Sequence, residues 1–165
     1  MMPKIDMRRT EYNTELFRLV DPNRKVLDIG CSTGKLGAQL KNMKNCYVVG
    51  IERDEKAAKE AAEVYDDVIT ADVEELDRLP YPSGFFDVII FGDVLEHTVH
   101  PDRVLRKLKS YLSDDGCICV SLPNIANWTV RIRLLFGIFQ YRSEGILDET
   151  HLHFYTLKTG KKMIE

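Results

Sequence analysis

Short apolar runs alternate with helix-forming segments along the first three quarters of the chain. Apolar residues occupy most positions of the runs at 25–30, 47–52, 67–73, 86–94 and 114–123. Strong helix formers or helically spaced apolar residues predict helices over 14–20, 35–43, 54–65 and 101–112. Strands that are apolar at consecutive positions are buried on both faces. The pattern therefore predicts an α/β fold, in which helices cover both faces of a parallel sheet of about five strands.

The composition narrows the class of protein. At 165 residues the chain fits one domain, and its net charge of -3 provides no basic surface for nucleic acid. No stretch approaches the roughly 20 apolar residues of a membrane span, and the N-terminus has no signal-peptide pattern. The four cysteines show no metal-binding or disulfide spacing, which is typical of reduced thiols. We therefore expect a cytoplasmic protein that binds no nucleic acid and has no membrane span.

A glycine-rich stretch, "LDIGCSTGKLG" at 27–37, follows the first apolar run and indicates a close backbone approach to a ligand. A nucleotide-triphosphate loop needs four residues between its glycines and a hydroxyl side chain after its lysine. Only three residues separate Gly30 from Gly34, and Leu36 follows Lys35. The spacing therefore excludes that type of loop.

A dinucleotide loop fits the same stretch only in part. Its three-glycine pattern, begun at Gly30, meets Ser32 and Lys35 at the second and third glycine positions. Glu52 lies 22 positions after Gly30 and suits a carboxylate that binds a ribose. Because a ribose carboxylate serves any adenosine ligand, an NAD-dependent oxidoreductase remains an alternative.

A longer set of residues resembles the class I S-adenosylmethionine-dependent methyltransferases that act on small molecules. The resemblance covers about residues 25–125 and rests on Asp28-x-Gly30-x-Ser32-x-Gly34, Glu52, Asp72 and "FDVIIFGDVLEH" at 86–97. It implies a Rossmann-like, doubly wound and mostly parallel sheet with the strand order 3-2-1-4-5. It also implies S-adenosylmethionine as the cofactor and methyl transfer to an oxygen or nitrogen as the reaction. A non-catalytic module that only binds the cofactor is the other alternative.

By this resemblance, each cofactor-binding residue has a role. Gly30 and Gly34 allow the close approach of the backbone, and Asp28 positions the loop and the amino-acid end of the cofactor. Ser32 stands where the family often has glycine. The remaining implied contacts are Glu52 with the ribose hydroxyls, Asp72 with the adenine amino group, the Val73 backbone with the adenine ring, and the Gly92 backbone with the methionyl amine.

The histidines fall into two short clusters, "EHTVH" at 96–100 and "THLH" at 150–153. Histidine has a pKa suited to proton transfer near neutral pH, so one of these side chains could take a proton from the methyl acceptor. We predict His97 as the first candidate base, and His151 with His153 as the second. The acidic composition favours a small-molecule, lipid or sugar acceptor over nucleic acid.

The spacing Asp93-x-x-Glu96-His97 also resembles a metal-binding pattern of some small-molecule and RNA-ribose methyltransferases of this class. One helical turn would bring these side chains together, and His151 or His153 could add a further metal ligand. Because such spacings arise easily by chance, we predict no metal site.

The last 42 residues continue the pattern only in part. We expect 127–139 to form a lid or core helix and 157–165 to begin another helix. Nothing after Leu122 reads as the antiparallel hairpin that completes the sheet of this class. We therefore expect a single methyltransferase domain over 1–165, truncated at its C-terminal side. The fifth strand would then be an exposed edge, through which two chains could pair as a homodimer.

Overall fold

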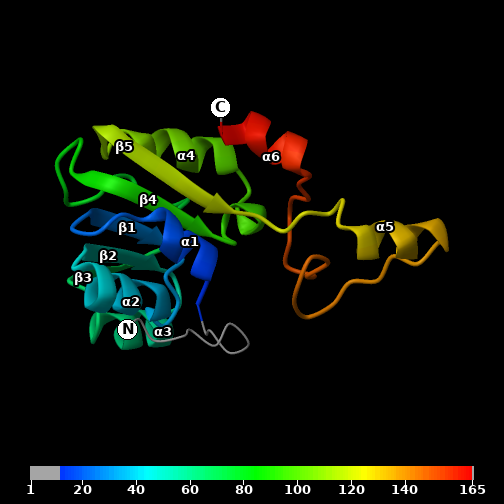
Figure 1. Ribbon diagram of the computed structural model, residues 1–165, viewed down its shortest axis with the longest axis horizontal. Helices are drawn as coiled ribbons and strands as arrows, with labels where there is room; N and C mark the ends of the chain where they lie inside the picture. Colours follow the sequence, from blue (N-terminus) through cyan, green and yellow to red (C-terminus); the bar gives the residue numbers. More distant parts are fainter. Residues whose placement is uncertain (1–11, 165) are drawn as a thin grey trace, which may run out of the picture.

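The computed structural model describes residues 12–164 and contains a five-stranded sheet with the order β3-β2-β1-β4-β5 (Figure 1). All neighbouring strands pair in parallel. The strands are β1 (Lys25–Ile29), β2 (Tyr47–Glu52), β3 (Asp67–Thr70), β4 (Phe86–Gly92) and β5 (Leu112–Ser121). The structure thus confirms the expected doubly wound sheet and its strand order.

Helices cover both faces of this sheet. The helices of the described chain are α1 (Thr14–Leu19), α2 (Lys35–Lys44), α3 (Glu55–Ala62), α4 (Pro101–Lys109), α5 (Trp128–Leu135) and α6 (Leu157–Ile164), with a 3-10 turn, η1, over Leu95–His97. Of these, α5 lies away from the sheet (Figure 1). Val26 and Val88 pack with side chains of α1, α2 and α3, whereas Leu27 and Ile89 pack with side chains of α4. Since successive strand residues point to opposite faces, the near-continuous apolar runs supply both layers of the core.

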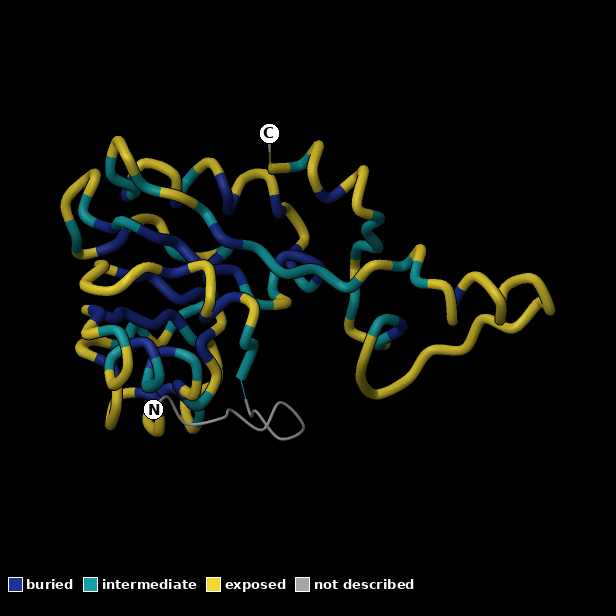
Figure 2. The backbone as a smooth tube through the Cα atoms, in the orientation of Figure 1, coloured by how far each residue is buried: buried dark blue, intermediate teal, exposed yellow. Residues whose placement is uncertain are grey.

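The chain after β5 leaves the sheet and then returns to it. In Figure 1, α5 lies far from the sheet, and Figure 2 shows most of residues 127–145 exposed. The segment then comes back to the end of β4, where the amides of Leu152 and His153 donate to the Glu96 carbonyl at 2.8 and 3.1 Å. This return brings residues 146–153 against η1.

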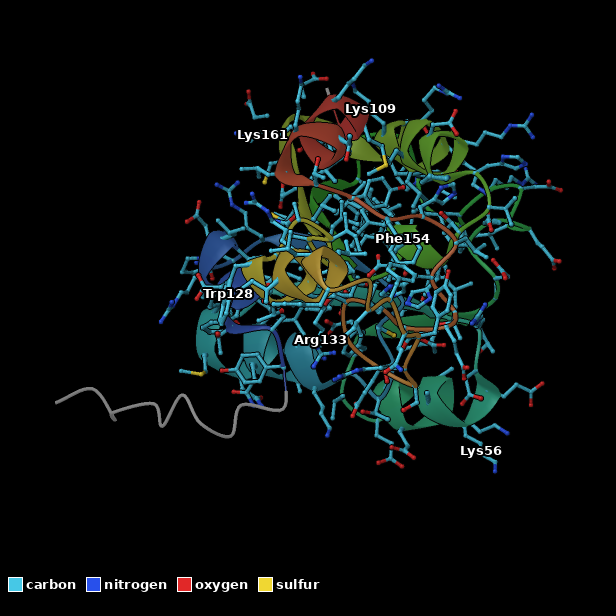
Figure 3. All side chains as sticks on the ribbon, turned by 90° about the vertical axis from the view of Figure 1, so that its right-hand side faces the viewer. Lys56, Lys109, Trp128, Arg133, Phe154 and Lys161 are labelled. Atoms are coloured by element: carbon cyan, nitrogen blue, oxygen red, sulfur yellow. The ribbon has the colours of Figure 1, made fainter. Side chains whose placement is uncertain are left out.

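The helix expected within 127–139 forms, but it is not a core helix. Val130 is the one buried residue of α5, and the Trp128 side chain is 69% exposed. Its apolar residues surround the helix axis, interrupted by Arg131 and Arg133, so no single apolar stripe can face the sheet. Figure 3 is turned so that this side faces the viewer, and it shows Trp128 and Arg133 on α5 and Phe154 on the returning segment.

Along residues 12–164, no helix combines the length and the apolar character needed to cross a membrane. β5 pairs with β4 on one side only, so within this described range it is an edge strand, as expected.

Tyr65, which follows α3, fills a space that glycines leave open. Its hydroxyl accepts a hydrogen bond from the Gly37 amide at 3.0 Å and donates one to Asp28 Oδ2 at 2.7 Å. A Cβ atom at Gly37 would overlap the Tyr65 ring, and one at Gly50 would lie 2.6 Å from Cys31 Sγ. Both glycines are therefore required by packing.

We expect Gly37→Ala to lower the free energy of unfolding by about 3 kcal/mol, because the added methyl group must displace a buried ring. Urea denaturation of the purified chain measures this change. Ala38→Gly, at the next position of α2, is the control. It should lower the free energy of unfolding by only about 1 kcal/mol, because glycine has a lower helix propensity than alanine. Equal stability of Gly37→Ala and the unchanged chain would contradict the prediction.

Candidate functional site

Two adjoining cavities lie at the carboxyl ends of the strands, where open parallel sheets bind ligands. The first has a volume of about 260 Å³ and includes Glu52 and Asp72 in its lining. The second has a volume of about 340 Å³ and includes Asp28 and Ser32. Gly30 and Asp93 line both cavities. A ligand with two unlike halves could therefore lie across them.

The structure brings most of the predicted cofactor residues to these cavities. Glu52, Asp72 and Val73 line the first cavity, Asp28, Ser32 and Gly92 line the second, and Gly30 lines both. Gly34 lines neither, because a Cβ atom there would lie 2.9 Å from the Tyr65 ring and 3.0 Å from the backbone of Ala61. Gly34 thus makes room for packing and starts α2.

The loop after β1 is held in a left-handed conformation at three positions. The φ angles are 66° at Gly30, 49° at Ser32 and 81° at Gly34. A Cβ atom at Gly30 would lie 2.6 Å from Val94 Cγ2, so the loop and the end of β4 approach closely. Ser32 adopts the left-handed conformation despite its side chain, at a cost of about 1 kcal/mol. This geometry explains why a glycine also suits the position of Ser32.

Glu52, at the end of β2, ties the loop to the neighbouring strand. Its Oε2 accepts a hydrogen bond from the Ser32 amide at 2.9 Å, and its Oε1 accepts one from the Asp54 amide at 2.9 Å. Each carboxylate oxygen can still accept a second hydrogen bond. Glu52 therefore has a fixed orientation at the wall of the first cavity while keeping acceptor capacity for a ligand.

Asp28 is buried at the floor of the second cavity. Burial raises the pKa of its carboxyl to about 7, although the hydrogen bond from Tyr65 acts in the opposite direction. The charge of Glu52 raises the pKa further. The side chain is thus poised between a neutral and an ionised form near neutral pH.

Glu74 is a wall residue of the first cavity that the sequence analysis did not identify. Its two carboxylate oxygens accept hydrogen bonds from the amides of Val99 and His100, both at 2.8 Å. The Glu74 amide in turn donates to Asp72 Oδ1 at 2.8 Å. These bonds join the loop after β3 to the segment before α4, and so fix the orientation of Asp72.

The structure brings His97 and His151 together. Their ring centroids are 4.7 Å apart, and His97 lines the first cavity beside Thr150. The His151 side chain is only 5% exposed, and its Nε2 lies 4.0 Å from Glu96 Oε1. His153 lies apart from this pair, with its Nε2 3.3 Å from the Val99 carbonyl oxygen. His97 lines the first cavity, whereas His151 and His153 line neither of these two cavities.

Glu96 and His97 group with His151 rather than with Asp93. The potential ligand atoms of Glu96, His97 and His151 all lie within 4.8 Å of one another. Asp93 takes a φ angle of 54°, and η1 begins only at Leu95. The expected single helical turn through Asp93, Glu96 and His97 is therefore wrong, because Asp93 has a left-handed backbone conformation and lies outside η1.

Glu96 is fully buried. Burial raises the pKa of its carboxyl to about 7, and the nearby charges of Asp93 and Asp148 act in the same direction. Sequence analysis could not reveal this environment, since it depends on the return of residues 146–153 from beyond α5.

Comparison with protein families gives one match that spans nearly the whole chain. The model of the family described as methionine biosynthesis protein MetW matches residues 9–162. Among curated proteins, the ubiquinone biosynthesis O-methyltransferase of Marinobacter nauticus is 31% identical over 126 residues, which are 73% of this chain and 52% of that protein. The sarcosine/dimethylglycine N-methyltransferase of Halorhodospira halochloris is 28% identical over 152 residues, or 88% of this chain and 50% of that protein. The chain thus spans about half the length of these relatives.

Solved structures share the fold. An S-adenosylmethionine-dependent methyltransferase from Thermotoga maritima superposes with a TM-score of 0.69 at 17% identity, covering 91% of this chain and 66% of that one. Another, from Archaeoglobus fulgidus, gives a TM-score of 0.69 at 20% identity, with 92% and 63% covered. These matches confirm the predicted Rossmann-like methyltransferase fold.

The raised pKa of Asp28 predicts a pH-dependent stability. Between about pH 4 and pH 7 the folded state keeps a proton that the unfolded state releases, so the free energy of unfolding falls as the pH rises. The shift from 3.8 to about 7 corresponds to at most about 4 kcal/mol. Asp28→Asn removes the carboxyl that causes this pH dependence. We therefore expect the free energy of unfolding of the variant to decline less between about pH 4 and pH 7 than that of the unchanged chain.

Urea denaturation at several pH values from 4.5 to 8 measures the difference between Asp28→Asn and the unchanged chain. Asp115→Asn, which changes an exposed carboxylate in β5, is the control and should follow the unchanged chain. Parallel pH profiles for Asp28→Asn and the unchanged chain would show that Asp28 is ionised throughout.

Proposed function

The chain belongs to the family of the methionine biosynthesis protein MetW, within the class I S-adenosylmethionine-dependent methyltransferases. We propose that it transfers a methyl group from S-adenosylmethionine to a small molecule. One observation carries this proposal. Carboxylates at or just beyond the ends of β1, β2 and β3 line two cavities that meet at Gly30 and Asp93. An adenosine half and an amino-acid half of one ligand would be held in adjacent spaces.

The first cavity suits the adenosine half of the cofactor. Glu52 is oriented by two backbone amides and keeps acceptor capacity for the two ribose hydroxyls. Asp72, which Glu74 holds in place, can accept a hydrogen bond from the adenine amino group, while the Val73 backbone meets the ring. These roles follow the family resemblance and use the side chains that the cavity presents.

The second cavity suits the methionine half. Asp28 and Gly92 line it at the ends of β1 and β4, and both can face a cationic amine. An ammonium group beside Asp28 would favour the ionised carboxylate and so lower its raised pKa. Binding of the cofactor would then be coupled to release of a proton from Asp28.

The acceptor side is the wall formed by His97 and Thr150. Methyl transfer is a displacement at a carbon bound to a sulfonium, so the protein must align the acceptor with that carbon and exclude water. S-adenosylmethionine, when bound, supplies the activated methyl group. The sequence prediction that His97 or His151 takes up the acceptor proton stays a prediction; His97 has the better position because it lines the cavity.

The similar O-methyltransferase of ubiquinone biosynthesis and the sarcosine/dimethylglycine N-methyltransferase support an oxygen or nitrogen of a small molecule as the acceptor. A lipid or sugar intermediate falls within the same proposal. The exclusion of nucleic acid rests on the net charge of -3. Pairing of two chains along β5 and a cytoplasmic location also stay predictions from the sequence.

Calorimetry with S-adenosylhomocysteine tests the cofactor. We expect the chain to bind this product, and Glu52→Ala to weaken binding about 100-fold, because the ribose loses charge-assisted hydrogen bonds. Glu60→Ala removes an exposed carboxylate from α3 and should leave the affinity unchanged. A thermal unfolding curve shows whether Glu52→Ala still folds.

Binding of NAD instead of S-adenosylhomocysteine would overturn the proposal in favour of an oxidoreductase. A chain that binds S-adenosylhomocysteine but moves no label from methyl-labelled S-adenosylmethionine to any hydroxyl or amine acceptor would be a binding module.

A further inference from the structure

The buried carboxylate of Glu96 lacks the partner that such a group requires. Its side chain is 0% exposed, and neither carboxylate oxygen accepts a hydrogen bond from any other residue in the described range 12–164. A buried carboxylate without a partner has lost the hydrogen bonds that water would give it, and nothing replaces them. The Glu96 carboxylate therefore needs either a bound cation or a proton to neutralise its charge.

The hydrogen bonds of the two adjacent histidines show where their lone pairs lie. His97 Nδ1 is 3.2 Å from the Thr150 carbonyl oxygen, and His151 Nδ1 is 3.3 Å from the Ile146 carbonyl oxygen. A carbonyl oxygen can only accept, so each Nδ1 carries the proton. In the neutral rings, Nε2 of both histidines is therefore an unprotonated acceptor.

Thr150 supports this assignment for His97. Its hydroxyl lies 3.1 Å from His97 Nδ1, but it already donates to Asp148 Oδ1 at 2.6 Å. The hydroxyl can therefore only accept from His97. The Nε2 atom of His151 thus faces Glu96 Oε1 at 4.0 Å as one acceptor facing another, too far apart for a direct hydrogen bond.

The surrounding charge favours a cation at this position. The carboxylates of Asp93 and Asp148 act electrostatically on Glu96, and both add negative charge near it. Asp148 Oδ1 accepts a hydrogen bond from the Thr150 hydroxyl, and that hydroxyl lies 3.1 Å from His97 Nδ1, so Asp148 lies close to the histidine pair. Positive charge placed among these carboxylates lowers their electrostatic energy.

We propose that Glu96, His97 and His151 bind a divalent first-row transition-metal ion. Their potential ligand atoms lie within 4.8 Å of one another. Ligand atoms at about 2.1 Å from a tetrahedral ion lie about 3.4 Å apart, so a pair must close by at most about 1.4 Å, which two side chains can share. Two imidazoles and one carboxylate favour zinc, manganese, iron or cobalt over magnesium or calcium, which prefer all-oxygen sites.

The fold supplies the features that metal-binding histidines usually have. Each imidazole donates its Nδ1 proton to a backbone carbonyl, which fixes the ring and leaves Nε2 for the metal. The ligands come from η1 and from residues 146–153, and the bonds from Leu152 and His153 to the Glu96 carbonyl hold these segments together. The ion would join the returning segment to the end of β4.

The proposal changes the role of the two predicted bases. A nitrogen that binds a metal cannot also accept a proton, so His97 and His151 become ligands. Because His97 lines the first cavity, the open side of the ion would face the acceptor and could bind an acceptor oxygen as a Lewis acid. This last consequence rests on the proposed methyl transfer, whereas binding of the ion does not.

Direct titration tests the site. We expect the full chain, stripped with a chelator, to bind one Zn²⁺ or Co²⁺ by calorimetry, and bound Co²⁺ to give visible absorption bands. Glu96→Gln and His151→Ala should each weaken binding at least 100-fold, since each removes a ligand. Saturation with Zn²⁺ should raise the Tm of the unchanged chain by about 5 °C and leave the Tm of these variants unaltered.

Matched controls lie outside the cluster. His100→Ala and Glu149→Gln change exposed residues of the same two types and should keep full metal affinity. If Glu96→Gln does not fold, His97→Ala and His151→Ala decide the question. S-adenosylhomocysteine titrations on the same samples separate a failure of the metal site from a failure of the proposed function.

Two results would overturn the metal site. One is the absence of saturable Zn²⁺ and Co²⁺ binding to the stripped chain, and the other is equal binding by the unchanged chain and the ligand variants. A higher Tm of Glu96→Gln with no effect of metal would identify Glu96 as a protonated carboxyl in a dry pocket.

Discussion

The hydroxyl of Tyr65 holds together the three elements on which the cofactor half of the site is built. It donates to Asp28 at the end of β1 and accepts from the Gly37 amide in α2, while Tyr65 itself follows α3. The ring occupies space next to Gly34, Gly37 and Gly50, where no other residue type fits. The loop between β1 and α2 has its shape because one aromatic ring lies beneath it.

This packing gives a second reason for the glycines in the stretch 27–37. The sequence suggests glycines that admit a ligand, and Gly30 fits that interpretation because it lines both cavities. Gly34 and Gly37 instead admit the Tyr65 ring. The two demands look alike in a sequence, since both require the absence of a side chain. Only the fold shows that Tyr65, 28 residues after Gly37, is the cause.

The sheet and the acidic residues that line the cavities could be predicted because their signals are local. Apolar runs mark the strands, and acidic residues such as Glu52 and Asp72 stand directly at or after strand ends, where parallel strands converge. The acceptor side could not be predicted in the same way. His151 meets Glu96 only because the chain leaves the sheet through α5 and returns. No local pattern encodes the length or direction of that excursion.

The buried carboxyls of Asp28 and Glu96 lie at opposite sides of the site and differ in their hydrogen-bond partners. Both have their pKa raised to about 7 by burial, but Asp28 has a phenol as its partner, and Glu96 has none within the described chain. The Tyr65 phenol donates to the Asp28 carboxylate and so stabilises its ionised form without adding charge. Two imidazoles with their Nε2 atoms free offer Glu96 no proton, and so they leave a negative charge to be matched. Asp28 thus completes its hydrogen bonds with residues of the fold, whereas Glu96 needs a proton or, as proposed above, a metal ion.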